Sequence, residues 1–302
     1  MPTLKSWLLA ARLRTLPLSI SGILMGTGMA LKDHFFNWTI FILALITTLG
    51  FQILSNFAND YGDGVKGTDN EERIGPARAL QSGLLRPIDL KRGMWFTALF
   101  TLIVAILLIY SAFGSAHFKL SLLFFFLGLA AIGAAIKYTV GESAYGYRGL
   151  GDVFVFIFFG LVGVLGSYFL YAQELAVFHF LPAITIGLLS VAVLHLNNMR
   201  DRLSDQKVGK RTLAVILGAT KSKQYHYGLL MVAALTWVGY LQWTQAKGFY
   251  YTSLLVFIPL VIHIRKIIKI KDPAALDPEL KKIALTTFAL SLVFILIAFN
   301  TN

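Results

Sequence analysis

Nine stretches of the chain are almost uninterrupted apolar sequence, each roughly 16 to 21 residues long. A helix of this length crosses the hydrocarbon core of a membrane, which is about 30 Å thick. The stretches are continuously apolar rather than alternating, which favours helices over the strands of a membrane barrel. The predicted spans are 16–31, 38–58, 94–113, 120–139, 153–171, 180–196, 227–243, 249–264 and 283–299.

The composition agrees with a chain that is embedded in lipid. It is 57% hydrophobic and only 14% charged, which excludes an ordinary soluble domain. Cysteine is absent, so disulfides, thiolate metal sites and cysteine nucleophiles are excluded as well. We therefore predict an all-α membrane protein: a bundle of nine transmembrane helices that forms one integral domain over residues 1–302.

The distribution of Lys and Arg predicts the orientation of this bundle. Cytoplasmic loops retain these residues preferentially. The N-terminal tail and every second connection after it hold 24 of the 27, whereas the other connections hold only Lys32, Lys119 and Lys247. We expect a multi-pass protein of the cell inner (plasma) membrane, with its N-terminus in the cytoplasm and its C-terminus outside. The net charge of +12 then reflects topology, so we expect membrane lipid as a partner and no nucleic acid.

Two Asp-rich stretches follow apolar segments on the predicted cytoplasmic side. The first runs from Asn56 to Asp69 and the second from Asn197 to Asp205. Residues three or four apart share a face of a helix, so we expect one stripe of Asn56, Asp60 and Asp63 and another of Asn197, Asp201 and Asp205. Clustered carboxylates that face a bundle interior are costly unless a cation is held there, and Mg²⁺ prefers oxygen ligands. We therefore predict Mg²⁺ as cofactor, with five metal ligands: Asp60, Asp63, Asp69, Asp201 and Asp205.

Basic residues follow the acidic ones in the same two loops. Carboxylates alone would also suit a divalent-cation transporter, but the added cations favour a magnesium-bridged diphosphate, whose oxygens need both metal and basic partners. The predicted diphosphate-binding residues are Lys66, Arg73, Arg78, Lys210 and Arg211. Two alternatives stay open: the Asp residues could merely solvate helix ends, and the topological bias alone could place individual basic residues there.

One other class of enzyme shares part of this pattern. The segment from Asp60 to Gly64 matches the start of the motif of CDP-alcohol phosphotransferases. The Ala-Arg pair that this motif requires two residues later is Gly67-Thr68 here. The match therefore fails.

The two loops together carry a resemblance to a known family. The first reads Asn56 to Asp69 followed by Glu71-Glu72-Arg73-Ile74-Gly75-Pro76, and the second runs from Asn197 through Asp205 to Val215. With Arg14-Thr15-Leu16-Pro17 at the first span, this chain resembles the UbiA superfamily of intramembrane prenyltransferases. Within it, the chain is most similar to the group that prenylates 1,4-dihydroxy-2-naphthoate in menaquinone biosynthesis.

The resemblance implies a reaction and roles for particular residues. A Mg²⁺-dependent enzyme of this kind transfers a polyprenyl group from polyprenyl diphosphate to 1,4-dihydroxy-2-naphthoate, with loss of CO₂ and diphosphate, giving demethylmenaquinol. The resemblance also implies catalytic roles for four residues: Asn56, Asp60, Asn197 and Asp201. The candidates around the aromatic acceptor are Arg14, Tyr138, Arg148 and Asp152. Other acceptors of the superfamily, such as 4-hydroxybenzoate, are the near alternatives.

Overall fold

The computed structural model describes residues 2–68 and 74–301, and the regular secondary structure in this part of the chain is helical throughout. Five long helical segments form the first part of the bundle, and the fifth of them consists of three consecutive helices. They are α2 (Leu16–Lys32), α3 (Trp38–Val65), α4 (Pro87–Phe113), α5 (Phe118–Lys137) and the continuous run of α6 (Gly151–Val155), the π-helical η3 (Phe156–Gly166) and α7 (Ser167–Ala172).

The second part continues with α8 (Phe180–Arg200), α10 (Leu213–Trp243), the 3₁₀ segment η5 (Gly248–Phe257) with α11 (Ile258–Lys269), and α12 (Asp277–Thr301). Shorter helical segments join these: α1 (Leu4–Ala11), η1 (Leu13–Thr15), η2 (Tyr145–Arg148), η4 (Val177–His179), α9 (Arg202–Lys207) and η6 (Pro273–Leu276).

The helix starts follow from local sequence. Pro17 and Pro87 stand in the first turns of α2 and α4, where a missing N–H costs nothing. The side chain of Asn37 caps α3 by accepting hydrogen bonds from Thr39 N and Ile40 N, at 2.9 and 3.2 Å. Thr212 caps α10 in the same way through Val215 N, at 3.4 Å.

Each of the nine predicted spans falls in, or nearly in, one of these long helical segments. Eight of the segments in the described part of the chain are long and apolar enough to cross a membrane. Helix α10, which contains the predicted span 227–243, is not among the eight. The multi-pass helical architecture is therefore confirmed, and the count of nine remains a prediction.

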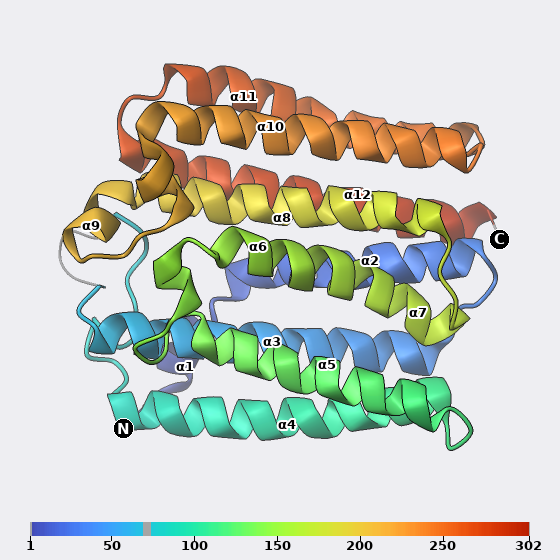
Figure 1. Cartoon of the computed structure of the whole chain (residues 1–302), viewed down its shortest axis with the longest axis horizontal. Helices are drawn as coiled ribbons and strands as arrows, with labels where there is room; N and C mark the ends of the chain where they lie inside the picture. The colour runs from blue at the N-terminus through green and yellow to red at the C-terminus, as the bar shows by residue number, and fades with distance from the viewer. Residues whose placement is uncertain (1, 69–73, 302) are drawn as a thin grey trace.

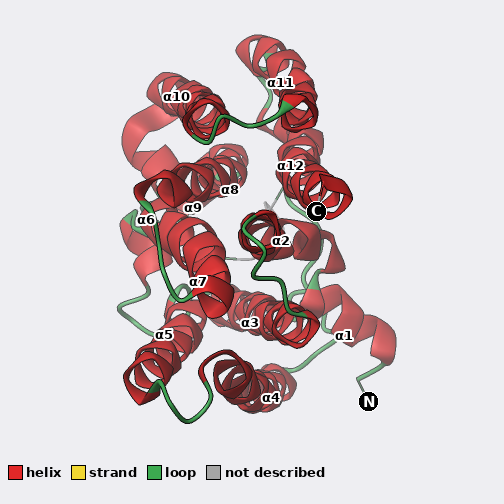
Figure 2. Cartoon of the chain, turned by 90° about the vertical axis from the view of Figure 1, so that its right-hand side faces the viewer, coloured by secondary structure: helices red, strands yellow, loops and turns green. Residues whose placement is uncertain are grey.

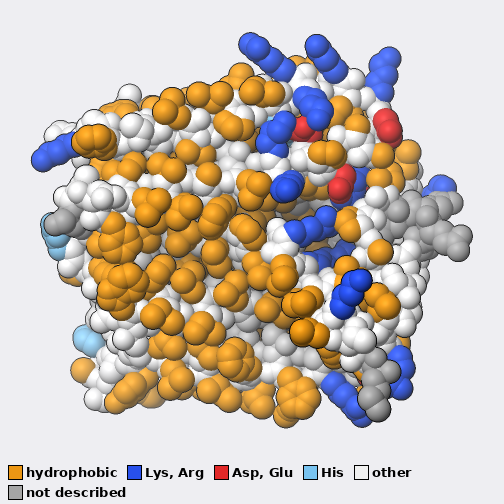
Figure 3. All heavy atoms as spheres, turned by 180° about the vertical axis from the view of Figure 1, so that it is seen from behind, with side chains coloured by type: hydrophobic (Ala, Val, Ile, Leu, Met, Phe, Trp, Pro, Cys, Tyr) orange, Lys and Arg blue, Asp and Glu red, His pale blue; other side chains and the backbone are white. Residues whose placement is uncertain are grey.

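The long helices lie side by side along the long axis of the molecule (Figure 1). The C-terminal ends of α3 and α8, which carry the two Asp-rich stretches, lie at the same end as the N-terminus, and the C-terminus lies at the opposite end (Figure 1). Viewed end-on, α2 lies in the interior, next to α3, α7, α8 and α12 (Figure 2). One face of the surface is a broad apolar belt, and most of its charged side chains lie towards the Asp-rich end (Figure 3).

Small residues allow the interior helices to approach closely. A Cβ atom on Gly26 of α2 would lie 2.4 Å from the carbonyl oxygen of Val164, and one on Gly160 would lie 2.7 Å from that of Ala183. Glycine is therefore needed at both positions, as is common where membrane helices pack tightly. This packing places the π-helical segment η3 directly against α2 and α8.

Candidate active site

An elongated cavity of about 800 Å³ runs between α2, α3, α4, α5, α6–α7, α8 and the start of α12. On α3 its lining extends from Ala44 to Asp63, a separation of about 28 Å along the helix axis. That distance is close to the ~30 Å of a hydrocarbon core. The inner part is apolar and includes Ile23, Ala44, Leu108, Phe124 and Leu170. The outer end, which we call the mouth, is lined by Asn59, Asp63, Asp201, Asp205 and Lys210.

The first Asp-rich stretch contributes Asp63 to the mouth. Asp63 is 5% exposed, and its Oδ1 accepts a hydrogen bond of 2.8 Å from the hydroxyl of Tyr147. The same hydroxyl lies 2.6 Å from Oγ1 of Thr68. Asn59, one turn before Asp63, also lines the cavity. The end of α3 therefore presents one carboxylate and one amide to the mouth.

Asp60 and Asn56 lie on another side of α3. The Asp60 carboxylate accepts hydrogen bonds from the backbone N–H groups of Ala79 (3.1 Å) and Leu80 (3.3 Å), and neither Asp60 nor Asn56 lines the cavity. Nδ2 of Asn56 donates to the carbonyl of Ala11 and to Oγ1 of Thr15, which ties the N-terminal segment to α3. Successive helix residues are about 100° apart, so the three residues of the predicted stripe do not point in the same direction. Of the three, only Asp63 lines the cavity. The metal and catalytic roles of Asp60 and Asn56 remain predictions.

The second Asp-rich stretch contributes Asn197, Asp201 and Asp205 to the same cavity. The guanidinium of Arg200 holds Asp201 in place, with Nε 2.8 Å from Oδ1 and Nη2 2.7 Å from Oδ2. Arg200 also donates to Asn197 Oδ1 at 2.8 Å and forms an ion pair with Asp277 of α12. Its side chain is fully buried, so this network connects α8 to α12 and orients the second set of oxygens.

Asp205 and Lys210 are the charged residues that follow Asp201 along the chain and line the mouth. Burial raises the pKa of Asp205 to about 6, an effect that the nearby Asp201 and Asp63 reinforce and that Lys210 opposes. The Nζ atom of Lys210 lies 3.5 Å from Asp205 Oδ1. Burial lowers the pKa of Lys210, but Asp63 and Asp205 outweigh it, so the pKa rises and the ammonium stays charged. A cation is therefore held between the two acidic stretches.

The other basic candidates divide into two groups. Arg78 lines the cavity together with Lys210, whereas Lys66 and Arg211 do not. Lys66 donates to the carbonyl of Gly141 at 2.9 Å and lies 4.1 Å from the centre of the Tyr147 ring. Arg73 and the predicted metal ligand Asp69 lie outside the described residues.

The acceptor candidates divide in the same way. Arg14 and Tyr138 line the cavity. Burial, reinforced by Asp63, raises the pKa of Tyr138, which keeps its hydroxyl protonated. Arg148 is exposed and does not line the cavity. Asp152 is 5% exposed and does not line the cavity; its Oδ2 lies 3.4 Å from Nδ1 of His195.

The donor atoms at the mouth fit magnesium bound together with a phosphate group. Within residues 2–68 and 74–301, no three acidic or histidine side chains converge closely enough to enclose an ion by themselves. Mg²⁺ in phosphate-handling sites is usually held by one or two carboxylates, waters and the substrate's own phosphate oxygens rather than by an all-protein cage. Asp63, Asp201 and Asp205, with the amides of Asn59 and Asn197 and the cation of Lys210, supply such a partial set.

Three contributors to this site were not among the predicted residues: Asn59, Tyr147 and Arg200. Asn59 carries a sequence signal, because it stands four residues before Asp63 and therefore on the same helix face. Tyr147 lies 84 residues from Asp63, and no spacing rule links the two. Arg200 adjoins Asp201 in sequence, but only the structure reveals that it is buried.

Fold and cavity together define a multi-pass helical membrane protein in which an acidic, magnesium-compatible mouth opens onto a long apolar cavity. The chain belongs to the UbiA prenyltransferase family, whose model matches residues 19–286. It is 42% identical over 295 residues to a 1,4-dihydroxy-2-naphthoate octaprenyltransferase of Haemophilus influenzae, covering 96% of this chain and 94% of that one. It is 38% identical to the Escherichia coli enzyme of the same name, covering 97% and 94%.

Solved structures support the same fold at lower identity. A UbiA homolog from Archaeoglobus fulgidus, bound to GPP and Mg²⁺, superposes with a TM-score of 0.65 at 14% identity and covers 98% of each chain. The apo structure of a UbiA homolog from Aeropyrum pernix gives a TM-score of 0.67 at 13% identity, over 95% of this chain and 96% of that one.

Proposed function

We propose that this protein transfers a polyprenyl group from polyprenyl diphosphate to 1,4-dihydroxy-2-naphthoate, with loss of CO₂ and diphosphate, to give demethylmenaquinol. The observation that carries the proposal is the joining of an acidic and basic mouth to a largely apolar interior, in one cavity whose lining on α3 extends over about 28 Å. The mouth suits a diphosphate and the cavity suits a long isoprenoid tail. The identity of 42% to a naphthoate octaprenyltransferase favours this acceptor over 4-hydroxybenzoate.

The reaction balances without an added oxidant or reductant. The C–O bond between the allylic carbon and the diphosphate breaks, and the bonding pair leaves with the diphosphate. The ring carbon that bears the carboxylate supplies an electron pair to the allylic carbon, forming the new C–C bond. The bond to the carboxylate then breaks, its electron pair restores the aromatic ring, and CO₂ leaves. The apolar cavity keeps water away from the allylic cation, which water would otherwise capture.

The residues of the mouth have separate tasks in this scheme. Asp63, Asp201 and Asp205, assisted by Asn197 and by the predicted ligands Asp60 and Asp69, would hold Mg²⁺, which neutralises charge on the departing diphosphate. Lys210 and Arg78 add fixed positive charge beside it. Arg200 keeps Asp201 and Asn197 oriented through its hydrogen bonds.

The proposed topology places this mouth on the cytoplasmic side of the inner membrane, with α10 as the ninth crossing. The opposite placement of the two chain termini supports an odd number of crossings (Figure 1). The 24-to-3 division of Lys and Arg supports a cytoplasmic mouth. Cysteine scanning suits this test because the chain has no native cysteine. A thiol near residue 208 should react from the cytoplasmic side only, and one at residue 300 from the outside only.

The function is tested with purified enzyme, Mg²⁺, a polyprenyl diphosphate and either 1,4-dihydroxy-2-naphthoate or 4-hydroxybenzoate, with products identified by mass. We expect a prenylated, decarboxylated naphthalenediol from the first acceptor and at most a trace of product from the second. Turnover of 4-hydroxybenzoate alone would reject the proposed acceptor. Magnesium transport without prenyl transfer would reject the enzyme class.

A further inference from the structure

A stripe of polar side chains runs down α3 from the mouth into the membrane. Thr48, Gln52, Ser55, Asn59 and Asp63 are spaced by four, three, four and four residues, and all of them line the cavity. This spacing keeps them on one helix face. Polar groups inside a membrane helix are costly and usually mark a binding or transport path. Asp63 and Asn59 belong to the mouth, so the middle of the stripe needs a different explanation.

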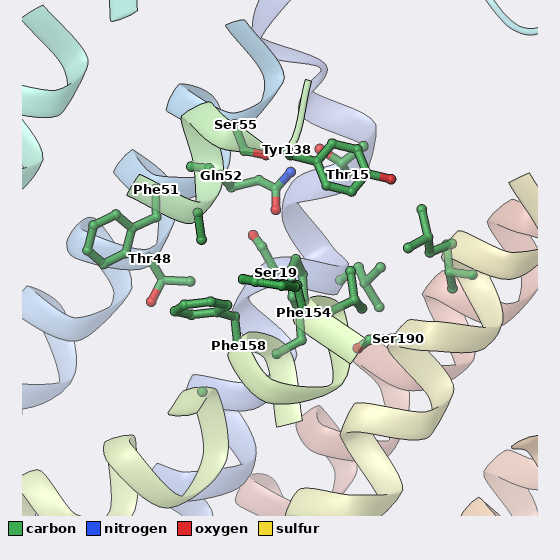
Figure 4. Close-up of a pocket in the computed structure, with 18 of the residues that line it drawn as sticks. Thr15, Ser19, Thr48, Phe51, Gln52, Ser55, Tyr138, Phe154, Phe158 and Ser190 are labelled. Atoms are coloured by element: carbon green, nitrogen blue, oxygen red, sulfur yellow. The ribbon is translucent and has the colours of Figure 1, made fainter. Parts of the chain in front are cut away.

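Aromatic side chains line the cavity near Gln52, in the middle of the polar stripe. The rings of Tyr145 and Phe154 are stacked, with centroids 3.9 Å apart and an interplanar angle of 19°, and Phe158 continues the stack at 6.3 Å and 20°. All three line the cavity. Figure 4 shows Phe154 and Phe158 beside one another, with the amide of Gln52 extending into the space near them. A flat ring placed there would meet aromatic faces on one side and hydrogen-bonding groups on another.

Ser190 of α8 has a buried hydroxyl that lacks a hydrogen-bond partner among the described residues, which is independent support for a ligand at this place. It lines the cavity and is 1% exposed, yet its Oγ has no hydrogen-bond partner in the described part of the chain. Other buried serines nearby are satisfied: Ser19 donates to the carbonyl of Leu16 at 2.8 Å. Gln52 uses its amide nitrogen to reach Asn56 Oδ1 at 3.2 Å, which leaves its carbonyl oxygen available. Unpaired polar groups are rare in a buried position and call for a partner, here a ligand in the cavity.

We propose that Gln52, Ser55 and Ser190 form the subsite that holds the aromatic acceptor, with its ring against Phe154 and Phe158 and its hydroxyl and carboxylate groups hydrogen-bonded to the three polar side chains. The subsite lies between the diphosphate-binding mouth and the apolar inner part, where the allylic carbon of the donor would enter. Gln52 offers both a donor and an acceptor, and the serine hydroxyls do the same. The three side chains carry no negative charge, so they do not repel a carboxylate on the acceptor.

This inference rests on the proposed prenyl transfer and concerns how the enzyme binds the aromatic acceptor, not how it binds the prenyl donor. Gln52→Leu and Ser190→Ala each remove hydrogen-bonding groups while nearly preserving volume. We expect each to raise the KM for the aromatic acceptor about tenfold, the effect of one lost hydrogen bond in a closed site. The KM for polyprenyl diphosphate should stay within about twofold, which also shows that the variants fold. The matched controls are Gln242→Leu on the exposed side of α10 and Ser111→Ala on α4, whose hydroxyl donates to its own Leu107 carbonyl.

A second measurement does not depend on turnover. Binding of 1,4-dihydroxy-2-naphthoate to the enzyme with Mg²⁺ and inorganic diphosphate, followed by calorimetry, should weaken about tenfold in Gln52→Leu and Ser190→Ala and stay unchanged in both controls. Unchanged acceptor binding in both variants would overturn the subsite, as would equal increases in the KM values of acceptor and donor. If the wild-type enzyme prenylates a different aromatic acid, the proposed naphthoate function fails, and the same variants tested with that acid still decide the subsite.

Discussion

The hydroxyl of Tyr147 donates a 2.8 Å hydrogen bond to Oδ1 of Asp63 and thereby connects the loop between α5 and α6 to the acidic end of α3. The carbonyl of Tyr147 also accepts a hydrogen bond of 3.1 Å from the backbone N–H of Arg211. Tyr147 therefore joins the loops that follow the two Asp-rich stretches. Its ring lies under the ammonium groups of Lys66 and Lys210, with distances of 4.1 and 5.2 Å to the ring centre.

Tyr147→Phe keeps the ring and removes only the hydroxyl. We expect the Mg²⁺ concentration for half-maximal activity to rise about tenfold, because partners that orient a metal ligand typically contribute 10- to 100-fold to metal affinity. Tyr110→Phe, on the exposed face of α4, is the control. An unchanged magnesium requirement in Tyr147→Phe would mean that this hydrogen bond does not orient Asp63.

Asp60 and Asp63 should respond differently to the same substitution. Asp60→Ala leaves the N–H groups of Ala79 and Leu80 without their acceptor, so we expect a loss of about 1–3 kcal/mol in stability together with loss of turnover. Asp63→Ala removes one of several crowded carboxylates, so turnover should vanish while the thermal midpoint stays near that of the wild type. The midpoints are measured in detergent. A larger fall for Asp63→Ala than for Asp60→Ala would contradict these assignments.

Magnesium binding should strengthen as the pH rises through about 6. Burial raises the pKa of Asp205 to about 6, and a metal binds the deprotonated carboxylate. Below this pH, binding must displace a proton; above it, no such cost remains. We expect the magnesium half-saturation concentration to fall by about tenfold between pH 5 and pH 7. A half-saturation concentration independent of pH across this interval would exclude Asp205 as a ligand.

Close packing at Gly26 gives a prediction about the fold itself. Gly26→Ala would put a methyl group 2.4 Å from the carbonyl oxygen of Val164, so we expect destabilisation of about 1–3 kcal/mol. Gly228→Ala in α10 is the matched control, because nothing lies within 4 Å of its added methyl group. Equal thermal midpoints for the two variants would show that α2 and η3 can separate without cost.

Much of the architecture could be predicted from the sequence because each membrane span is determined locally by its own apolar run. The predicted helices 16–31 and 38–58 correspond to α2 and α3, although α3 continues to Val65. The extension carries Asp63 beyond the apolar part and out to the mouth. The span 227–243 stays a prediction: it lies in α10, a helix of 31 residues with a kink at Gly218, which is not among the eight segments that are long and apolar enough to cross a membrane.

The site could be predicted only in part, and the reason is the distance along the chain between contacting groups. Helical spacing brings Asn197, Asp201 and Asp205 to one cavity, as expected. The spacing of Asn56, Asp60 and Asp63 defines a stripe but not which edge of it faces the cavity, so Asn59 was missed. Arg148 ends the 3₁₀ segment η2 and Asp152 lies in the first turn of α6. The directions of these elements depend on tertiary packing, and neither residue lines the cavity.

The central claim is that side chains of both Asp-rich stretches bind one magnesium–diphosphate group. Its most direct test is calorimetric binding of an unreactive thiolo analogue of the prenyl diphosphate, with Mg²⁺, to the wild type, Asp63→Asn, Asp201→Asn and the double variant. We predict that each single change weakens binding at least tenfold and that the double change weakens it by clearly less than the product, because residues that share one ligand are coupled. Wild-type affinity in either single variant, or losses that multiply independently, would contradict the claim.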